Sequence, residues 1–142
     1  MKTKITQYGD WATWVTFDVL ADYQVRLIFT NDLMKSAHER LGSTPDAGVT
    51  DGFVFNCKGK GLSYLFLRLD APENSVAHES WHIVHRMFEW CGVRDYDDEI
   101  VAYHIDHMVE KVYEFKQAVK SSTTKEASDG QPVSGTSGKS TD

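Results

Sequence analysis

Apolar and polar residues alternate twice near the start of the chain, over residues 13–20 and 24–30. Side chains along a strand point to opposite faces in turn, so this alternation predicts two strands that each bury one face. Only residues 21–23 separate them, which is short enough for a turn. We therefore expect a hairpin here.

A second pair of strands is predicted at residues 53–57 and 62–69, because the glycine-rich segment 58–61 between them favours a tight turn. Between the two hairpins the apolar spacing changes to that of a helix. Asn31 is placed to cap this helix, and Gly42 is placed to end it after Leu41. The glycine- and proline-containing segment 42–52 is then a loop.

Two longer helices follow. Asn74 or Ser75 can cap the first, which runs to Cys91 and ends at Gly92. The second begins in the acidic segment 95–98, which suits a helix N-terminus, and its apolar periodicity continues to about Val119. Grouped rather than alternating strands and helices predict an α+β fold, with a small antiparallel or mixed sheet packed on about three helices.

The composition changes abruptly after Lys120. Residues 121–142 are rich in Ser, Thr and Gly and contain one large aliphatic residue. Such a segment buries too little apolar surface to offset the entropy of ordering, so we predict a single domain over 1–120 and a flexible tail over 121–142.

Charge and hydropathy indicate which partners and which cellular location to expect for the protein. The chain carries a formal net charge of -6, and its basic residues are scattered, which argues against nucleic-acid binding. It contains no apolar stretch of the length that spans a bilayer and no apolar segment of a secretory signal at its start. We expect a cytoplasmic protein without membrane association.

The sequence His78-Glu79-Ser80-Trp81-His82 carries the candidate chemistry. Residues four apart project from one face of a helix, so both imidazoles can bind one Zn²⁺ ion. Glu79 then lies beside the metal, where a carboxylate can accept a proton from a water activated by zinc. The alternative is that these are ordinary surface histidines of an amphipathic helix.

Catalytic zinc sites usually have three protein ligands. The candidate is Glu99, near the start of the last helix, because a short connection makes the two long helices antiparallel neighbours. His85 is an alternative third ligand, although three ligands on one straight helix rarely converge on one ion.

An H-E-x-x-H helix followed by a helix with a ligand glutamate, here Glu99-Ile100-Val101-Ala102, resembles the gluzincin type of zincin metallopeptidases, including small zincin-like proteins of phages and bacteria. The resemblance covers residues 62–108. It implies that His78, His82 and Glu99 are zinc ligands, that Glu79 is general base and acid, and that the strand at 62–69 borders the substrate cleft.

This sequence departs from that family at two positions: Tyr103 stands where a polar residue such as Asp or Asn is common, and Trp81 is bulkier than usual. Further side chains are candidates for the surroundings of the metal. Tyr103, His104 or His107 could steady a developing oxyanion, and Asp106 could orient a ligand histidine. Each of them could equally be a solvated helix-face residue.

Two functions follow from these residues. The first is a zinc-dependent hydrolase, most readily a metallopeptidase that acts on a peptide or protein substrate. The second is a protein that keeps a zincin scaffold and its zinc but binds or inhibits a partner protein without cleaving it, which the small size of the domain favours.

Overall fold

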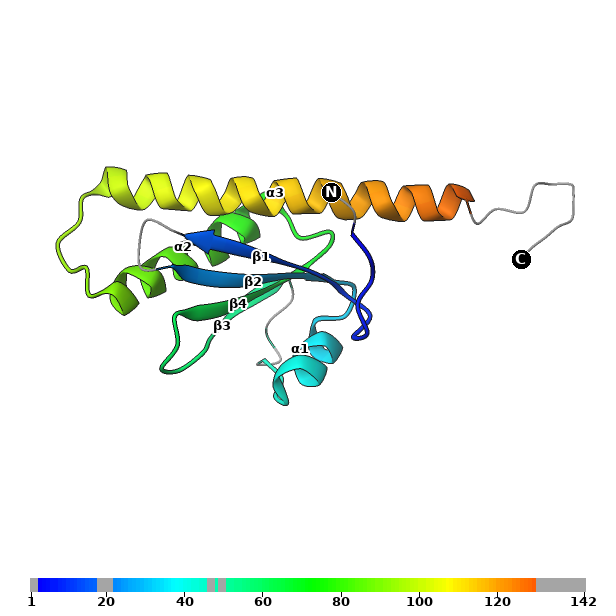
Figure 1. Ribbon diagram of the computed structural model, residues 1–142, viewed down its shortest axis with the longest axis horizontal. Helices are drawn as coiled ribbons and strands as arrows, with labels where there is room; N and C mark the ends of the chain where they lie inside the picture. Colours follow the sequence, from blue (N-terminus) through cyan, green and yellow to red (C-terminus); the bar gives the residue numbers. More distant parts are fainter. Residues whose placement is uncertain (1–2, 18–21, 46–47, 49–50, 130–142) are drawn as a thin grey trace, which may run out of the picture.

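The described part of the chain forms an α+β fold with four strands and three helices, as its pattern predicts (Figure 1). The computed structural model describes residues 3–17, 22–45, 48 and 51–129. The elements are, in chain order, β1 (Trp11–Phe17), β2 (Tyr23–Thr30), α1 (Leu33–Leu41), β3 (Gly52–Asn56), β4 (Leu62–Arg68), α2 (Glu73–Cys91) and α3 (Asp98–Asp129). Residues 18–21, which belong to the end of the first predicted strand and its turn, lie outside the described residues.

The strands form one mixed sheet in the order β1-β2-β4-β3. Both predicted hairpins are confirmed as antiparallel pairs, and β2 and β4 join them through a parallel pairing. Strand β4 therefore has a partner on each side. The expectation that the strand at 62–69 borders the substrate cleft is wrong, because β4 is an inner strand that is paired on both sides, whereas β1 and β3 are the edge strands of the described sheet.

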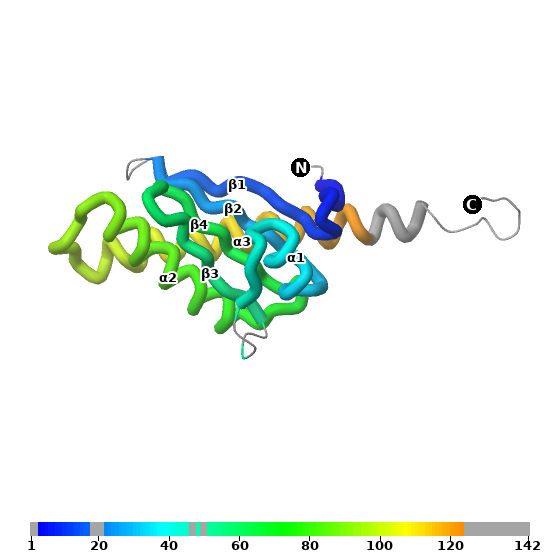
Figure 2. The backbone as a smooth tube through the Cα atoms, turned by 90° about the horizontal axis from the view of Figure 1, so that it is seen from below, coloured from blue at the N-terminus to red at the C-terminus, as the bar shows by residue number. Residues whose placement is uncertain are grey.

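The sheet has helices on both faces (Figures 1 and 2). Alternate residues of β2 and β4 face α2 and α3, and this side holds the main core. The residues between them, Ile28 and Phe66, pack with Leu33 of α1 on the opposite face. None of the helices in the described part of the chain is long and apolar enough to cross a bilayer.

The buried face of α2 only partly matches the one that its sequence suggests. The sequence predicts a core-facing stripe of apolar residues, namely Ala77, Trp81, Val84, Phe88 and Cys91. Val84 and Phe88 are buried as expected, but Ala77 and Trp81 are exposed. The buried side chains of the helix are Val76, Ser80, Ile83, Val84, Met87 and Phe88. This orientation buries three further apolar side chains against the sheet, and it turns the two motif histidines outward.

The helix ends differ from the predictions at three places. Asp32, rather than Asn31, caps α1 by accepting a hydrogen bond from the Lys35 backbone N–H over 3.1 Å. Helix α2 begins at Glu73 after Pro72, ahead of both predicted caps, and Gly92 ends it in the left-handed conformation as expected. Helix α3 continues past Val119 to Asp129, and the remaining part of the predicted tail, residues 130–142, lies outside the described residues.

Candidate functional site

Helix α2 brings the two motif histidines together. They are separated by one helical turn, and their Nε2 atoms lie 3.2 Å apart with the rings nearly perpendicular. Two imidazole nitrogens bound to one tetrahedral zinc ion at ~2.05 Å would be separated by about 3.3 Å. The spacing of His78 and His82 fits two ligands of a single ion, and it is also the length of a hydrogen bond between the two rings.

The electrostatic setting favours the metal-binding form of one of these histidines. Burial, together with the neighbouring imidazoles of His78 and His85, lowers the pKa of His82 from its usual value. The ring is then neutral at neutral pH, and a neutral imidazole has the nitrogen lone pair that a metal requires. Both histidines are exposed, and 68% of the His78 side chain is accessible to solvent.

Glu79 lies beside the histidines and is less exposed than His78. Its side chain is 13% exposed, and Oε2 lies 4.0 Å from Nε2 of His78. Burial raises the pKa of this carboxyl group, although the nearby His78 opposes the shift. A carboxylate held next to two imidazoles, but not in contact with them, is suitably placed to accept a proton from a water molecule between them.

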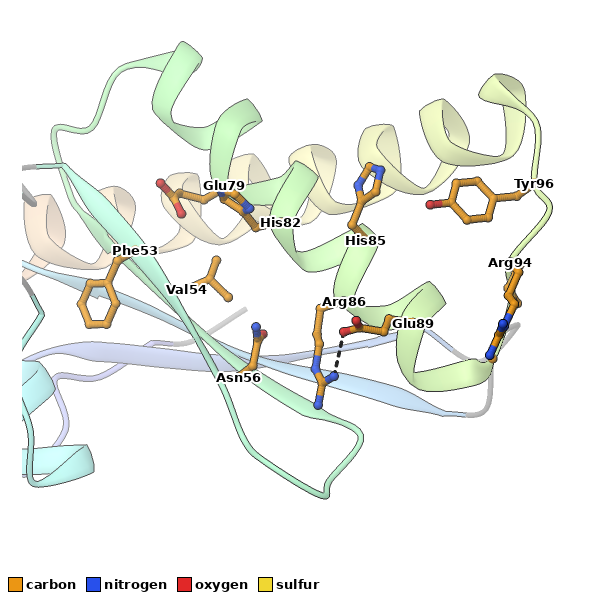
Figure 3. A pocket seen from close by; sticks show the side chains of 12 residues that line it. Phe53, Val54, Asn56, Glu79, His82, His85, Arg86, Glu89, Arg94 and Tyr96 are labelled. Atoms are coloured by element: carbon orange, nitrogen blue, oxygen red, sulfur yellow. Dashed lines mark hydrogen bonds and ion pairs between the residues drawn. The ribbon is translucent and has the colours of Figure 1, made fainter.

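A groove of about 940 Å³ runs along α2 between the helix and the edge strand β3 (Figure 3). Glu79 and His82 line the groove along the middle of α2. Arg94 and Tyr96, which follow the end of α2, line it further along. Phe53, Val54 and Asn56 of β3 form the opposite wall. The groove therefore joins the motif to β3, whose outer edge has no strand partner among the described residues.

Glu99 is not brought to the two histidines. It is an exposed residue in the first turn of α3, immediately after the loop that follows α2. His82 lies about 13 Å of helix before the end of α2, and the contact of the Phe88 and His104 rings at 5.4 Å shows that α3 runs back alongside α2 from its start. The predicted short loop and antiparallel packing are thus present, but they leave Glu99 near the far end of α2.

No other described residue joins His78 and His82 as a third metal ligand. Among the described residues, no group of three or more His, Cys, Asp or Glu side chains is arranged to hold a metal ion. His85, the alternative third ligand, stacks on Trp81 with ring centroids 3.7 Å apart, and its Nδ1 lies 2.9 Å from the Trp81 carbonyl oxygen. It lines the groove beside the motif without joining the histidine pair.

The side chains proposed for the surroundings of the metal are dispersed along α3. Tyr103 is 67% exposed, and Asp106 is also exposed. His104 is buried between Phe17 and Phe88, and its Nδ1 lies 2.8 Å from the Ile100 carbonyl oxygen. These three residues do not line the groove.

His107 contributes to a different hollow. It makes an edge-to-face contact with Phe17 and lines a smaller pocket of about 380 Å³ between β1 and α3. This pocket does not include the motif histidines or Glu79. His107 is therefore separate from the groove that runs along α2.

The sequence analysis did not anticipate several polar groove residues, of which Arg86 and Asn56 lie nearest to one another across the groove. Arg86 lies four residues after His82, on the same face of α2, and Asn56 faces it from β3. The spacing 78, 82, 86 was a usable signal for Arg86, because residues four apart share a helix face. No comparable signal existed for Asn56, whose position depends on which strand lies at the sheet edge.

Comparison with models of protein families, with curated proteins and with solved structures finds no match to this chain.

Proposed function

We propose that the protein is a metal-dependent hydrolase that acts on peptides, with His78 and His82 as metal ligands and Glu79 as the proton acceptor. The observation that carries this proposal is the 3.2 Å separation of the two Nε2 atoms, which suits one shared zinc ion. When bound, zinc would lower the pKa of water and polarise a substrate carbonyl.

The chain's own residues supply the remaining requirements. Glu79 is held in a partly buried position from which it can take a proton from water and return it to a leaving amine. The neutral form of His82 is the ligand form. Strand β3 borders the groove, so its free edge can pair with an extended peptide and hold a carbonyl group next to Glu79.

The third ligand in this proposal is still Glu99, as the gluzincin resemblance implies. Since it lies near the far end of α2, its participation requires the segment 92–97 to change conformation. Measuring zinc affinity of the Glu99→Ala variant tests this point. A loss of affinity similar to that of His82→Ala supports Glu99 as a ligand, whereas unchanged affinity excludes it.

A second candidate function has an observation in its favour. Because no three-ligand group is assembled among the described residues, the histidine pair could hold a metal whose further ligands come from a partner protein. The protein would then bind its partner through the metal without hydrolysing it. The carboxylate of Glu79 would not be needed for that activity.

The Glu79→Gln variant separates the two functions. Glutamine keeps the shape of the side chain but cannot accept the proton, so zinc uptake should persist while cleavage of a mixed peptide library falls by at least about 100-fold. Glu110→Gln, an exposed glutamate of α3, is the matched control. Equal cleavage by wild type and Glu79→Gln would contradict the hydrolase proposal, and binding without cleavage by both would favour the second function.

A further inference from the structure

The groove contains a guanidinium group whose hydrogen-bonding capacity is only partly used. Arg86 reaches from α2 toward the sheet, and its Nη1 donates to Oε1 of Glu89 over 3.0 Å (Figure 3). The Tyr23 hydroxyl also interacts with this guanidinium from the core side. Its Nε is buried and has no hydrogen-bond partner among the described residues, which costs free energy. The side chain is 20% exposed and lines the groove, so a ligand there can reach the outer part of the guanidinium but not Nε itself unless the side chain shifts.

The carboxylate partner of Arg86, Glu89, is held weakly. The side chain of Glu89 is 73% exposed, whereas that of Arg86 is 20% exposed. An ion pair with a solvated carboxylate contributes little to stability, because water competes for both groups. Glu89 can therefore give up Arg86 to a better-placed acceptor at small cost.

Other donors lie along the same groove. Arg94 lines it near the end of α2, and Asn56 lines it from β3. The Oδ1 atom of Asn56 accepts a hydrogen bond from the Ser63 hydroxyl over 2.8 Å, which leaves the amide NH₂ group to donate. The lining also contains the carboxylates of Glu79 and Glu89, so the indication of an anionic ligand comes from the donors of Arg86, Arg94 and Asn56 and not from an excess of positive charge in the groove.

The shape of the guanidinium narrows the ligand chemistry. Its planar N–H groups match the two oxygens of a carboxylate, and such charge-assisted pairs are stronger than neutral hydrogen bonds. We propose that Arg86 binds a carboxylate of the peptide in the groove, either its C-terminal carboxylate or the side chain of an aspartate or glutamate.

This inference rests on the proposed function, since it takes the groove to be the peptide-binding site. His82 and Arg86 are about 6 Å apart along the axis of α2, and an extended peptide advances about 3.3 Å per residue. The carboxylate would therefore belong to a residue one or two positions away from the bond that faces Glu79. The proposal makes the protein selective for acidic or C-terminal peptide segments.

The test uses three fluorescein-labelled alanine hexapeptides and the full-length Glu79→Gln protein with zinc, so that binding is measured without cleavage. One peptide has a free C-terminus, one is amidated and contains a single Glu, and one is amidated with Gln in its place. Fluorescence anisotropy should show at least one of the two carboxylate peptides binding about tenfold more tightly than the Gln peptide. Which of the two binds tightly identifies the source of the carboxylate.

Three further variants in the same background assign the effect to Arg86. Arg86→Gln should abolish the preference, and Glu89→Gln should strengthen carboxylate binding about two- to fivefold by removing a competing carboxylate. Arg68→Gln, which removes an exposed arginine outside the groove, is the matched control and should leave the preference for carboxylate peptides unchanged. Thermal melting establishes whether each variant is folded. If Arg86→Gln does not fold, the effect of Glu89→Gln alone shows whether Arg86 binds the carboxylate.

Equal binding of all three peptides, or no binding of any, would overturn the proposal. A preference that survives in folded Arg86→Gln, or an affinity unaffected by Glu89→Gln, would also overturn it. These results do not depend on hydrolysis. Failure of the carboxylate proposal is therefore distinguishable from failure of the hydrolase proposal, which the cleavage assay measures.

Discussion

Burial distinguishes Glu79 from the first histidine of its motif. The carboxyl group is turned into the groove, whereas His78 projects into solvent. The sequence predicted the pairing of the histidines, because a spacing of four residues fixes their relation on any helix. It did not predict the unequal exposure, which depends on how α2 is rotated about its axis against the sheet.

The raised pKa of Glu79 predicts that this residue lowers the stability of the folded protein in a pH-dependent way. A carboxyl group with a higher pKa in the folded than in the unfolded state makes the folded protein less stable as pH rises through the folded pKa. Glutamine has no such charge. The Glu79→Gln protein without metal should therefore melt about 1–3 °C above wild type at pH 7, with the difference disappearing below about pH 4.

Differential scanning calorimetry in the presence of a chelator measures this difference between pH 4 and 8. The Glu110→Gln variant provides the comparison, because that glutamate is exposed on α3. A wild-type protein that melts at or above Glu79→Gln at pH 7 would show that burial of this carboxyl group is not costly.

A second residue-level feature is the buried ion pair between the N-terminal segment and α1. Nε and Nη2 of Arg40 donate to the two carboxylate oxygens of Asp10 over 2.9 and 2.7 Å, and the Asp10 side chain is fully buried. Burial raises the pKa of Asp10, but hydrogen bonds from Arg40 and Thr6 outweigh it, so the pKa is lowered overall.

Removing one member of this pair leaves the other charge buried. Arg40→Met should destabilise the protein by about 3–5 kcal/mol in urea unfolding at pH 7. Arg68→Met, which breaks an exposed pair with Asp70, should cost far less, because water screens that pair.

The cost of Arg40→Met should also depend on pH in a defined direction. Because the pKa of Asp10 is lowered in the folded protein, the stabilisation is present above its ordinary value of 3.8 and is lost as pH falls through the folded pKa. The difference between wild type and Arg40→Met should therefore shrink in acid. Equal costs for Arg40→Met and Arg68→Met at pH 7 would contradict a stabilising role for the buried pair.

At the scale of elements, periodicity predicted every helix and strand but not which faces they bury or which neighbours they pair with. The alternation in 62–69 correctly indicated a strand. It could not indicate that β4 lies between β2 and β3, because alternation describes the faces of a strand and not its edges. In α2, apolar Trp81 was expected in the core, yet it stacks on His85 at the surface.

The position of β3 depends on a glycine. A Cβ atom at Gly52 would lie 2.6 Å from the Phe66 carbonyl oxygen and 2.7 Å from Cδ2 of Leu67. Because backbone must move to relieve this contact, Gly52→Ala should destabilise the protein by about 1–3 kcal/mol and weaken peptide binding in the groove that β3 borders.

Gly61→Ala is the matched comparison within the same hairpin. There the added Cβ would meet the indole of Trp90 at 2.8 Å, but this partly exposed side chain can rotate away. We therefore expect Gly61→Ala to lower the free energy of unfolding, measured by chemical denaturation, less than Gly52→Ala does. The opposite order would show that β3 tolerates displacement from β4.

At the scale of the whole molecule, the grouping of strands and helices in the sequence predicted the α+β class. It did not predict how far α3 is shifted along α2. The sequence indicates that two helices with a short connection are antiparallel, but side-chain packing sets which turns face each other. Here Phe88 packs against both Tyr96 and His104, and this contact keeps the start of α3 near the end of α2. Glu99 is held there with it, away from His78 and His82.

The groove is likewise a product of the assembled molecule. It requires α2 and the edge strand β3 to lie side by side, and these elements are connected through β4. Residues from both walls, such as Glu79 and Asn56, are distant in the chain. The sequence therefore identified the motif from its residue types and their spacing, but not the groove that lies beside it.

The central claim, that one metal ion binds between two imidazoles of α2, is tested most directly by equilibrium dialysis against zinc followed by metal analysis. Wild type should take up one zinc ion per chain, and His38→Ala, which removes an exposed histidine of α1, should do the same. His78→Ala and His82→Ala should each retain less than about a tenth of that zinc at the same free concentration. Zinc uptake by both variants equal to that of wild type would contradict the account.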